Sequence, residues 1–402
     1  MRIYNGMWRT KLKNRIKSSR FLYGLYFYFG SAAVRLLRLF IVPRNDLVLF
    51  VCFGGKKSDD SPRAVYEWML RDDECSGLHF VWAFEKPSQQ DVPGAEKVRI
   101  DSFAYYVQAL RAGCWVTNSG VERGLSFKPR STFLLNTWHG TPIKKIGQDA
   151  LNKKECYEIR SRYKENVMLA QGKYEADIFS RAFGIDRDKY AVVGLPRNDG
   201  LSDRSDETYR TCRKKLGLPE NKKVILYAPT FREFDRDKHL NITLAPPIDF
   251  AKWEASLGGE YLVLFRAHYE VARILNVSGA SDFVHDVSDY PRLNDLILAS
   301  DLLISDYSSI FFDYAIQEKP MLCFAYDYEK YRDTRGMYFD LRTEIPGGIV
   351  TTEQELLNAL TSLDYSENIA ETVRFRDKFI DTYGDASHRT VEIIKSELRK
   401  RA

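Results

Sequence analysis

One histidine in the sequence stands where acid–base chemistry is expected. His139 follows an apolar run and precedes Gly140, Thr141 and Pro142, with Lys144 close behind. Glycine permits a sharp turn, Thr141 suits a helix cap and Pro142 a first helical turn, so we expect His139 beside a helix amino terminus. Free N–H groups there attract anions, and an imidazole in that place is suited to be a general base near a phosphate. The alternative is a structural histidine.

A second histidine follows another apolar run. Arg266 and His268 come at the end of the strand expected over 261–266. They point to the same side if the strand pleat continues, because side chains alternate with a period of two. A histidine whose hydrogen bonds are satisfied at a strand terminus is the alternative.

Other strand ends carry cationic and hydroxyl side chains. Arg232 follows the strand expected over 223–228 and could clamp a phosphate with two hydrogen bonds, or could pair with a neighbouring carboxylate at the surface. Asp306, Ser308 and Ser309 precede a helical pattern. Capping explains one serine, whereas two serines favour a diphosphate ligand.

Several cofactor signals are missing from the sequence. The loop 53–58 resembles a phosphate loop but lacks the Walker spacing, so a tight turn is the alternative. No Cys/His cluster has metal-ligand spacing and no Gly-x-Gly-x-x-Gly occurs, so we predict neither a metal nor another cofactor. The six cysteines are scattered, which fits a reducing compartment.

These residues must be positioned by alternating strands and helices. The expected strands are 47–53, 78–84, 113–117, 132–138, 190–194, 223–228, 261–266, 282–286, 301–305 and 320–325. The expected helices are 62–71, 101–111, 155–183, 206–216, 249–257, 291–299, 309–317, 353–362 and 366–400. Near-continuous apolar strands between helices are typical of buried parallel sheets.

Two such series meet near 196–206. They predict an α/β protein with two doubly wound domains facing a cleft, where ligands bind beyond the carboxyl ends of the strands. The expected boundaries are 46–200, 201–385 and a final helix end, 386–402.

The charge of the chain is unevenly distributed. Residues 1–45 hold ten basic and no acidic residues, so the remainder of this +5 chain has a net charge of −5. A mildly acidic body argues against a nucleic-acid binder. The apolar, aromatic run 21–34 is shorter than the roughly 20 residues that span a bilayer, so we expect 1–45 to lie on an anionic membrane. A helix packed on the protein core, a signal peptide and a membrane anchor are the alternatives.

Five stretches together resemble the CDP-glycerol glycerophosphotransferase family. They are His139–Gly147, Tyr227–Arg232, Arg266–His268, Asp301–Ala315 and Arg335–Asp340, and the resemblance runs over about 47–385. It implies a GT-B fold, a CDP-linked donor held by the second domain and a peripheral place at the cytoplasmic face of the cell membrane.

The resemblance implies roles for single residues as well. His139 and His268 match the family's essential histidines, and Arg232, Ser308 and Ser309 match phosphate-contacting positions. We expect Gly140, Thr141, Lys144, Arg266 and Asp306 to bind substrate beside them. The match loosens at Pro346–Val350, which could lie near the cytidine.

The predicted reaction is transfer of glycerol phosphate from CDP-glycerol, with release of CMP. The expected acceptor is an undecaprenyl-diphosphate-linked saccharide, and the short amino-terminal region favours a primase-like enzyme of wall teichoic acid synthesis. Alternatives are a glycerol- or ribitol-phosphate polymerase using CDP-glycerol or CDP-ribitol, a GT-B sugar-nucleotide glycosyltransferase, and a non-catalytic anion-binding protein at the membrane surface.

Overall fold

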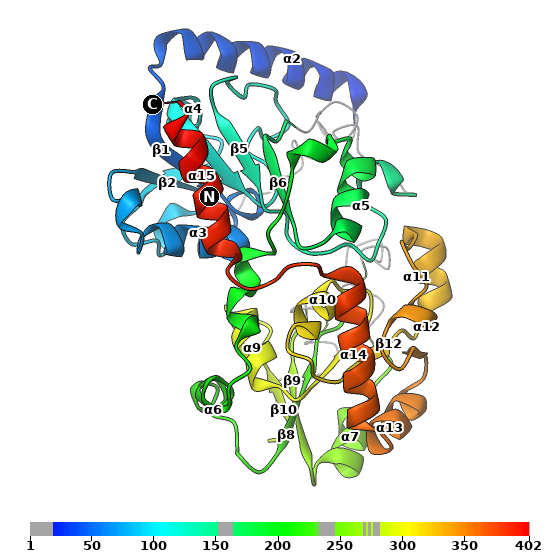
Figure 1. The fold of residues 1–402 in the computed structure, drawn as a ribbon. Helices are drawn as coiled ribbons and strands as arrows, with labels where there is room; N and C mark the ends of the chain where they lie inside the picture. The colour runs from blue at the N-terminus through cyan, green and yellow to red at the C-terminus, as the bar shows by residue number, and fades with distance from the viewer. Residues whose placement is uncertain are drawn as a thin grey trace, which may run out of the picture. The chain divides into compact units, whose positions relative to one another are not determined.

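The computed structural model describes residues 19–151, 164–230, 232, 246–267, 271, 275 and 282–401. The chain forms two compact units. Unit 1 comprises residues 1–139, 146–199 and 382–402, and unit 2 comprises 140–145 and 200–381. Both are α/β units built on parallel sheets, as the sequence predicted (Figure 1).

Unit 1 holds a seven-stranded sheet of order β3-β2-β1-β4-β5-β6-β7, in which every neighbouring pair is parallel. Its strands are β1 (Arg44–Val51), β2 (His79–Phe84), β3 (Glu96–Arg99), β4 (Ala112–Thr117), β5 (Phe133–Asn136), β6 (Val167–Ala170) and β7 (Tyr190–Val192). Its helices are α2 (Arg20–Leu37), α3 (Asp60–Met69), α4 (Phe103–Arg111), α5 (Lys173–Phe183) and α15 (Ala386–Arg399).

Alternate side chains of β1 bury into opposite cores. Val48 and Phe50 pack with α3 and α15, whereas Leu47, Leu49 and Val51 pack with α4. This period of two explains the unbroken apolar run, because both faces of the sheet are covered by helices. Figure 1 shows α15 beside α3, so the last helix of the chain completes the core of the first unit.

Unit 2 holds a six-stranded sheet of order β10-β9-β8-β11-β12-β13, again parallel throughout. Its strands are β8 (Lys223–Tyr227), β9 (Tyr261–Phe265), β10 (Val284–Asp286), β11 (Leu302–Ser305), β12 (Met321–Phe324) and β13 (Ile349–Val350). Its helices are α6 (Asp206–Lys215), α7 (Phe250–Leu257), α9 (Leu293–Ala299), α10 (Ile310–Ala315), α11 (Tyr328–Arg335), α12 (Leu341–Glu344), α13 (Glu353–Thr361) and α14 (Tyr365–Phe379). Trp253 and Leu257 of α7 and Leu356 of α13 cover one face of this sheet.

In each parallel sheet the strand order runs outward in both directions from one point, the topological switch point. In unit 1 this switch lies between β1 and β4, and in unit 2 between β8 and β11. Ligands of doubly wound folds bind beyond the strand ends at such switches. The residues after β1, β4, β8 and β11 are therefore the first candidates for a site.

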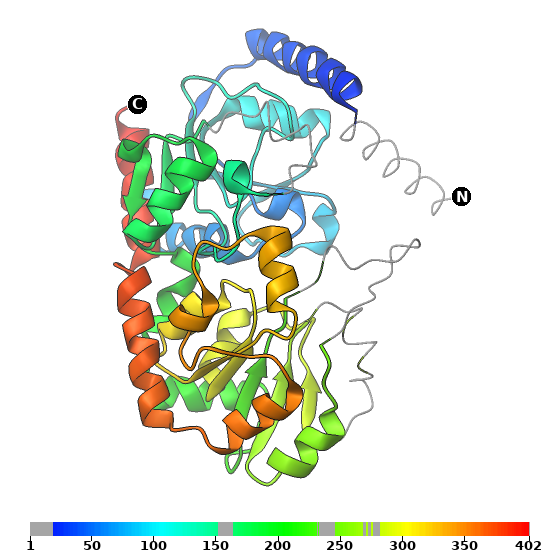
Figure 2. The same ribbon diagram turned by 90° about the vertical axis from the view of Figure 1, so that its right-hand side faces the viewer.

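Helix α2 lies along the outside of unit 1 (Figure 2). The Tyr23 hydroxyl donates a hydrogen bond of 3.0 Å to the Gly124 carbonyl, and the Arg35 guanidinium donates one of 2.8 Å to the Ser126 hydroxyl. No helix within the described ranges has both the length and the apolar character needed to cross a bilayer.

Three of the sequence predictions of helices are wrong. The stretch expected over 155–183 contains strand β6, a four-residue apolar run too short to be told from helix by periodicity. The stretch expected over 366–400 divides into α14 and α15, because Gly384 and Asp385 both adopt left-handed φ angles. No α-helix begins at Thr141. The segment there is extended and forms a bridge between Lys144 and Met337.

Candidate functional site

In unit 1, the loops after β1, β4 and β5 converge on His139. Asn118 follows β4 and its side chain is fully buried. Its Oδ1 accepts a hydrogen bond of 2.8 Å from the Phe53 amide, and its Nδ2 donates one of 3.3 Å to Oδ2 of Asp60. Its backbone oxygen lies 2.7 Å from Nδ1 of His139. Asn118 therefore joins the loop after β1, the start of α3 and the loop after β5.

The contact with Asn118 decides which nitrogen of His139 carries a proton. A carbonyl oxygen only accepts hydrogen bonds, so Nδ1 must be the N–H and neutral His139 keeps its lone pair on Nε2. The ring stacks on Trp138 at 4.2 Å between centroids and lies 5.9 Å from the ring of Phe53. Two aromatic rings thus contact the imidazole.

These neighbours also shift the titration of the imidazole. Desolvation by the surrounding atoms lowers the pKa of His139 below its usual range, opposed by the hydrogen bond to Asn118 and by the charge of Asp60. The residue keeps an exposed edge, so water limits the size of this shift. A neutral histidine near physiological pH is the form in which Nε2 accepts a proton.

Backbone strain gathers around the same histidine. Phe53, Asp60 and Trp138 adopt positive φ angles of 46°, 61° and 52°. Each such conformation costs a non-glycine residue about 1–3 kcal/mol, and persists only where the surroundings impose it. Residues of this kind cluster at functional sites, so the strain makes this corner of unit 1 a candidate site.

In unit 2, the loops after β8, β11 and β12 converge on Arg232. Its side chain is 1% exposed. The guanidinium pairs with Asp306 at 2.9 Å and with both oxygens of Asp327, at 2.8 and 2.9 Å. It also donates to the Thr230 carbonyl. In this arrangement Arg232 ties three loops together, which is a different role from the phosphate contact that the resemblance implies.

Aromatic rings surround this buried cation. The ring of Tyr307 stacks on that of Tyr331 at 3.7 Å, and the guanidinium of Arg232 lies within about 5 Å of both ring centroids. The ammonium of Lys144 lies 5.9 Å from the centroid of Tyr331. Lys144 therefore stands beside the strand-end cluster of unit 2, although it is only five residues from His139 in unit 1.

The segment with Lys144 is fixed by backbone pairing. The Lys145 amide donates to the Gly336 carbonyl at 3.0 Å, and the Tyr338 amide donates to the Ile143 carbonyl at 2.9 Å. This pairing replaces the helix expected at Thr141. It joins two of the motifs that carried the family resemblance, His139–Gly147 and Arg335–Asp340.

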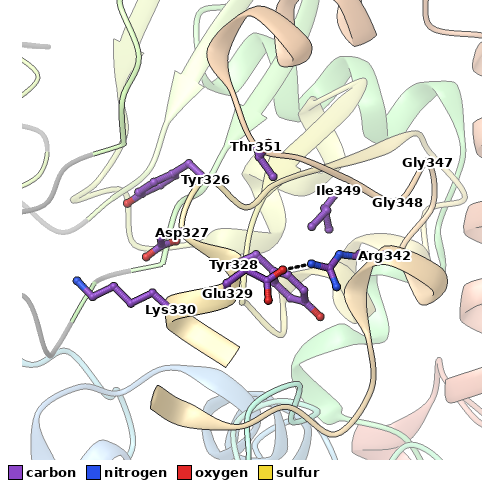
Figure 3. Close-up of a pocket in the computed structure, with 10 residues that line it drawn as sticks. All are labelled: Tyr326, Asp327, Tyr328, Glu329, Lys330, Arg342, Gly347, Gly348, Ile349 and Thr351. Atoms are coloured by element: carbon purple, nitrogen blue, oxygen red, sulfur yellow. Dashed lines mark hydrogen bonds and ion pairs between the residues drawn. The ribbon is translucent and has the colours of Figure 1, made fainter. Parts of the chain in front are cut away.

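A pocket of about 650 Å³ lies next to Arg232's partner Asp327 (Figure 3). It is lined by Tyr326, Asp327, Tyr328, Glu329, Lys330, Arg342, Gly347, Gly348, Ile349 and Thr351. Glu329 and Arg342 form an ion pair across it. Gly348 has a φ of 67°, and a Cβ there would lie 3.1 Å from the Arg342 carbonyl oxygen. The pocket is the size of a small-molecule site and opens near the carboxyl end of β12.

The other predicted residues lie as follows. Gly140 and Thr141 are buried in unit 2, while His268 lies outside the described residues. Arg266 donates to the carbonyls of Val287 and Tyr290 at 3.1 and 2.6 Å. Their substrate contacts stay predictions.

The serine pair lies at the start of α10. Ser308 accepts a hydrogen bond from the Ile310 amide, and Ser309 is the N-cap residue but makes no side-chain capping bond. Asp306 accepts hydrogen bonds from the Thr230 and Tyr307 amides, so it orients the backbone of both loops. Diphosphate binding by the two serines also stays a prediction.

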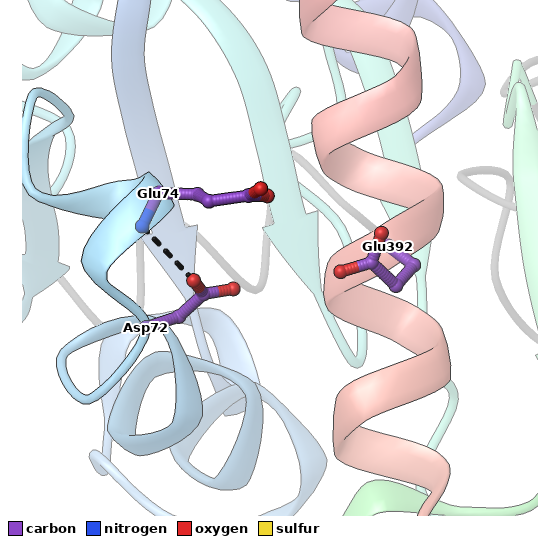
Figure 4. Close-up of side chains that lie close together, drawn as sticks. All are labelled: Asp72, Glu74 and Glu392. Carbon is purple, nitrogen blue, oxygen red and sulfur yellow. Dashed lines mark hydrogen bonds between the residues drawn. The ribbon is translucent and has the colours of Figure 1, made fainter.

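Three carboxylates elsewhere in unit 1 have the spacing of metal ligands. Figure 4 shows Asp72 and Glu74 facing Glu392 of α15, and their oxygens lie within 4.8 Å of one another. The ammonium of Lys395 pairs with Asp72 at 2.9 Å, with Glu74 at 2.6 Å and with Glu392. The lysine supplies the positive charge that a cation would bring, so this cluster fastens α15 to unit 1.

Sequence reasoning missed several residues of the two clusters. Asn118 and Asp327 each lie one to three residues beyond a predicted strand, and Arg197 lies in the polar run that follows 190–194. Arg197 donates hydrogen bonds to the His139 carbonyl at 2.8 Å and to Asp60 at 3.3 Å. Applying the strand-end rule to every predicted strand would have found all three.

The chain is similar to known proteins over most of its length. Residues 34–396 match the model of a family described as CDP-Glycerol:Poly(glycerophosphate) glycerophosphotransferase. The chain is 34% identical over 373 residues to the teichoic acid glycerol-phosphate transferase of Staphylococcus aureus, covering 88% of this chain and 94% of the relative.

Two named polymerases differ in how much of them the chain spans. It is 35% identical to the teichoic acid poly(glycerol phosphate) polymerase of Staphylococcus epidermidis over 88% of this chain, but spans only about half (51%) of that relative. The polymerase of the same name from Bacillus spizizenii is 31% identical over 88% of this chain and is spanned over 93% of its length.

A solved structure of the wall teichoic acid polymerase TagF, in an H444N variant soaked with CDPG, has the same fold. The TM-score is 0.80 at 32% sequence identity, over 89% of this chain and 90% of that one.

Proposed function

This chain belongs to the CDP-glycerol:poly(glycerophosphate) glycerophosphotransferase family, and from that premise we propose that it transfers glycerol phosphate from CDP-glycerol to a lipid-diphosphate-linked saccharide. The family match across residues 34–396 carries the proposal, and it identifies the chain as a transferase. The CDPG soak of the TagF relative supports CDP-glycerol as the donor.

The reaction joins an acceptor oxygen to the glycerol-side phosphorus of the donor. The bond from that phosphorus to the bridging oxygen breaks, and CMP leaves with the bond electrons. In the proposed mechanism Nε2 of His139 takes the acceptor proton, which the Nδ1–H tautomer supports. His268, Ser308 and Ser309 are proposed to hold the diphosphate, and catalysis then rests on positioning and charge stabilisation.

We further propose that the second unit binds the CDP portion and that the enzyme has a GT-B architecture. The 650 Å³ pocket beside Asp327 is the candidate for the nucleoside end. It lies beside the loop 346–350, where the family resemblance loosens, so the base specificity of this chain is best examined there.

The number of units added is a separate question. A relative named a glycerol-phosphate transferase is matched over 94% of its length and another relative is named a glycerol-phosphate primase, which together favour a primase-like enzyme. A polymerase is the second candidate, because a named polymerase is matched over 93% of its length. Chain length therefore does not separate the two, whereas the mass of the lipid product does.

The decisive assay supplies CDP-glycerol or CDP-ribitol with a lipid-linked disaccharide and measures CMP and the lipid masses. We expect CMP and a lipid heavier by one glycerol phosphate. A ladder of masses would establish the polymerase, and release of a nucleoside diphosphate from a sugar nucleotide would establish a glycosyltransferase. Binding of CDP-glycerol without turnover on any acceptor would contradict the transferase mechanism.

Replacing His139 with Ala tests the base. CMP release should fall by about 10²–10⁴-fold, the usual contribution of a general base. The folded state should survive, because the imidazole edge is exposed. His388→Ala is the matched control, since this exposed histidine on α15 forms ion pairs with Asp385 and Glu392 and contacts the ring of Trp68. Near-normal CMP release by the His139 variant would refute its assignment.

We propose that helix α2 brings the enzyme to an anionic membrane at the cytoplasmic face of the cell. One face of α2 docks on the loop around Gly124, while the other carries exposed apolar side chains. This stripe continues to residue 42 and consists of Phe21, Leu25, Tyr28, Phe29, Leu36, Leu39, Phe40 and Val42. Together with the ten basic residues of 1–45, it has the composition of an interfacial helix.

Vesicle binding tests this surface. Replacing Phe21, Phe29 and Phe40 with Ser should lower binding to anionic phospholipid vesicles by about 10³-fold or more, because each Phe contributes about 1.5–3 kcal/mol when it is buried. Phe103→Ser is the control, since Phe103 and Phe29 are both 72% exposed and Phe103 lies on α4. Unchanged binding by the triple variant would contradict a role for α2.

A further inference from the structure

The ring of His139 is held by residues that the proposed chemistry does not use. They come from three separate places in unit 1: Asp60 at the start of α3, Asn118 after β4 and Arg197 in η7 (Pro196–Ser202). Asn118 is wholly buried, and the side chains of Asp60 and Arg197 are mostly so. Buried polar side chains that hydrogen-bond to one another make the loop around this imidazole more rigid than an ordinary surface loop.

The hydrogen bonds of these residues form a closed ring that begins and ends at His139. Asn118 receives the Nδ1–H of His139 on its backbone oxygen and donates from Nδ2 to Oδ2 of Asp60. The same Asp60 oxygen accepts from Nη1 of Arg197, and Nη1 also donates to the His139 carbonyl. Both the ring and the backbone of His139 are thereby fixed to one set of side chains.

We propose that Asp60, Asn118 and Arg197 are positioning residues that hold His139 as the Nδ1–H tautomer and aim Nε2 at the acceptor hydroxyl. This inference rests on the proposed function of His139 as a base. Within the described residues no hydrogen bond to Nε2 is formed, which leaves that nitrogen for the substrate proton. Groups that orient a catalytic imidazole through its other nitrogen fix its tautomer in the same way.

The two charged members of the network act on the imidazole with opposite sign. Asp60 raises the pKa of His139 and Arg197 lowers it, while desolvation remains the largest cause of the overall lowering. These are the two charged side chains that face the ring, from α3 and η7 respectively. Removing either charge should therefore move the pKa in the direction opposite to removing the other, and a positioning role further requires the rate of CMP release to follow.

The experiment measures the pKa of His139 directly and the rate separately. The chain has six histidines, so the Cε1–H resonance of His139 is assigned in a titration by its loss in His139→Gln. We expect Asp60→Asn to lower this pKa and Arg197→Gln to raise it, because each variant removes a charge that acts on the imidazole. The acidic limb of the rate of CMP release should move with the pKa in both variants.

Asn118→Ala tests orientation rather than charge. It should lower kcat about 10-fold or more with little change in the KM for CDP-glycerol, because the donor is proposed to bind to unit 2 and Asn118 belongs to unit 1. Since loss of a buried amide could prevent folding, Asp60→Asn and Arg197→Gln keep the proposal testable by themselves. Asp186→Asn and Arg187→Gln, which break exposed ion pairs of unit 1, are the matched controls and should shift neither quantity.

Different outcomes refute the positioning network and the proposed transfer reaction. If the wild type shows no transfer but the two charge variants shift the pKa in opposite directions, the network stands and the proposed function fails. If the wild type transfers glycerol phosphate but neither variant moves the pKa or the rate limb, the network is refuted. A pKa that moves while kcat and its pH limb stay fixed also refutes the positioning role.

Discussion

Removing Arg232 should destabilise unit 2 severely. In Arg232→Met the carboxylates of Asp306 and Asp327, of which 2% and 8% of the side chains are exposed, lose their common cation. Breaking a buried ion pair from one side costs about 3–5 kcal/mol, since a buried charge is left uncompensated. For a unit of the size of residues 200–381, each kcal/mol lowers Tm by about 2–4 °C, so we expect a loss of about 6–20 °C.

The same contacts predict a rescue. Adding Asp306→Asn and Asp327→Asn to Arg232→Met removes both uncompensated charges. The amide oxygen at position 306 can still accept from the Thr230 and Tyr307 amides, and the one at position 327 from the Tyr307 hydroxyl. The triple variant should therefore be more stable than Arg232→Met alone, because neutral polar groups are less costly to bury than charges. This order of stability is specific to an electrostatic cause.

Urea and thermal denaturation, with fluorescence and circular dichroism as two probes, measure both effects. Arg374→Met is the control, because Arg374 is 69% exposed and lies 3.6 Å from its partner Glu371, so the change should stay within about 0.5 kcal/mol. A single variant within about 1 kcal/mol of the wild type, or a triple variant no more stable than the single one, would show that Arg232 is not the buried support inferred here. Activity of the Arg232 variants is informative about phosphate binding only after this measurement.

Two further predictions concern lysines. Lys395→Met should increase hydrogen exchange in α15 and lower the urea midpoint of unit 1, because Asp72, Glu74 and Glu392 then repel one another. This loss of stability should be smaller in 1 M salt, which screens the repulsion. Unchanged hydrogen exchange in α15 would contradict the role of Lys395 in fastening this helix. Burial lowers the pKa of Lys319 from 10.5 to about 8. Between these pH values the unfolded chain binds more protons than the folded chain, so the free energy of unfolding should rise with pH from about 8 to 10.5. Lys319→Met should lack this rise, and equal pH profiles for the two proteins would sink the assignment.

The sheets could be predicted because their strands are covered on both faces. Runs such as Leu47–Val51 and Leu302–Ile304 are continuous apolar segments, and burial on both sides leaves no polar alternation to confuse them with amphipathic helix. Edge strands were harder: β3 buries only Val98 among its four residues, and β13 has two residues. Such short elements are defined by their neighbour in the sheet rather than by their own sequence.

The site was predicted in part for a similar reason. Strand ends are visible in the sequence, so His139, Arg232 and Asp306 could be singled out. What each side chain touches depends on loops that meet only in the folded unit, as Asn118 does with Asp60 and His139. The extended path of Gly140–Lys145 depends on pairing with residues about 190 positions later, which no local pattern of Thr141 and Pro142 reports.

The position of α15 has a consequence for how the chain is made. Val391, Ile394 and Leu398 fill the core of unit 1, but residues 200–381 are synthesised before them. At about 5–20 residues per second, strands β1 to β7 wait roughly 10–40 s on the ribosome for their last covering helix. During that interval the face of β4 and β5 that α15 covers stays open, although α3 already packs against β1, and open apolar surface of this kind is what chaperones bind. A stalled or truncated product would be recognised as unfinished through its first unit, not its last.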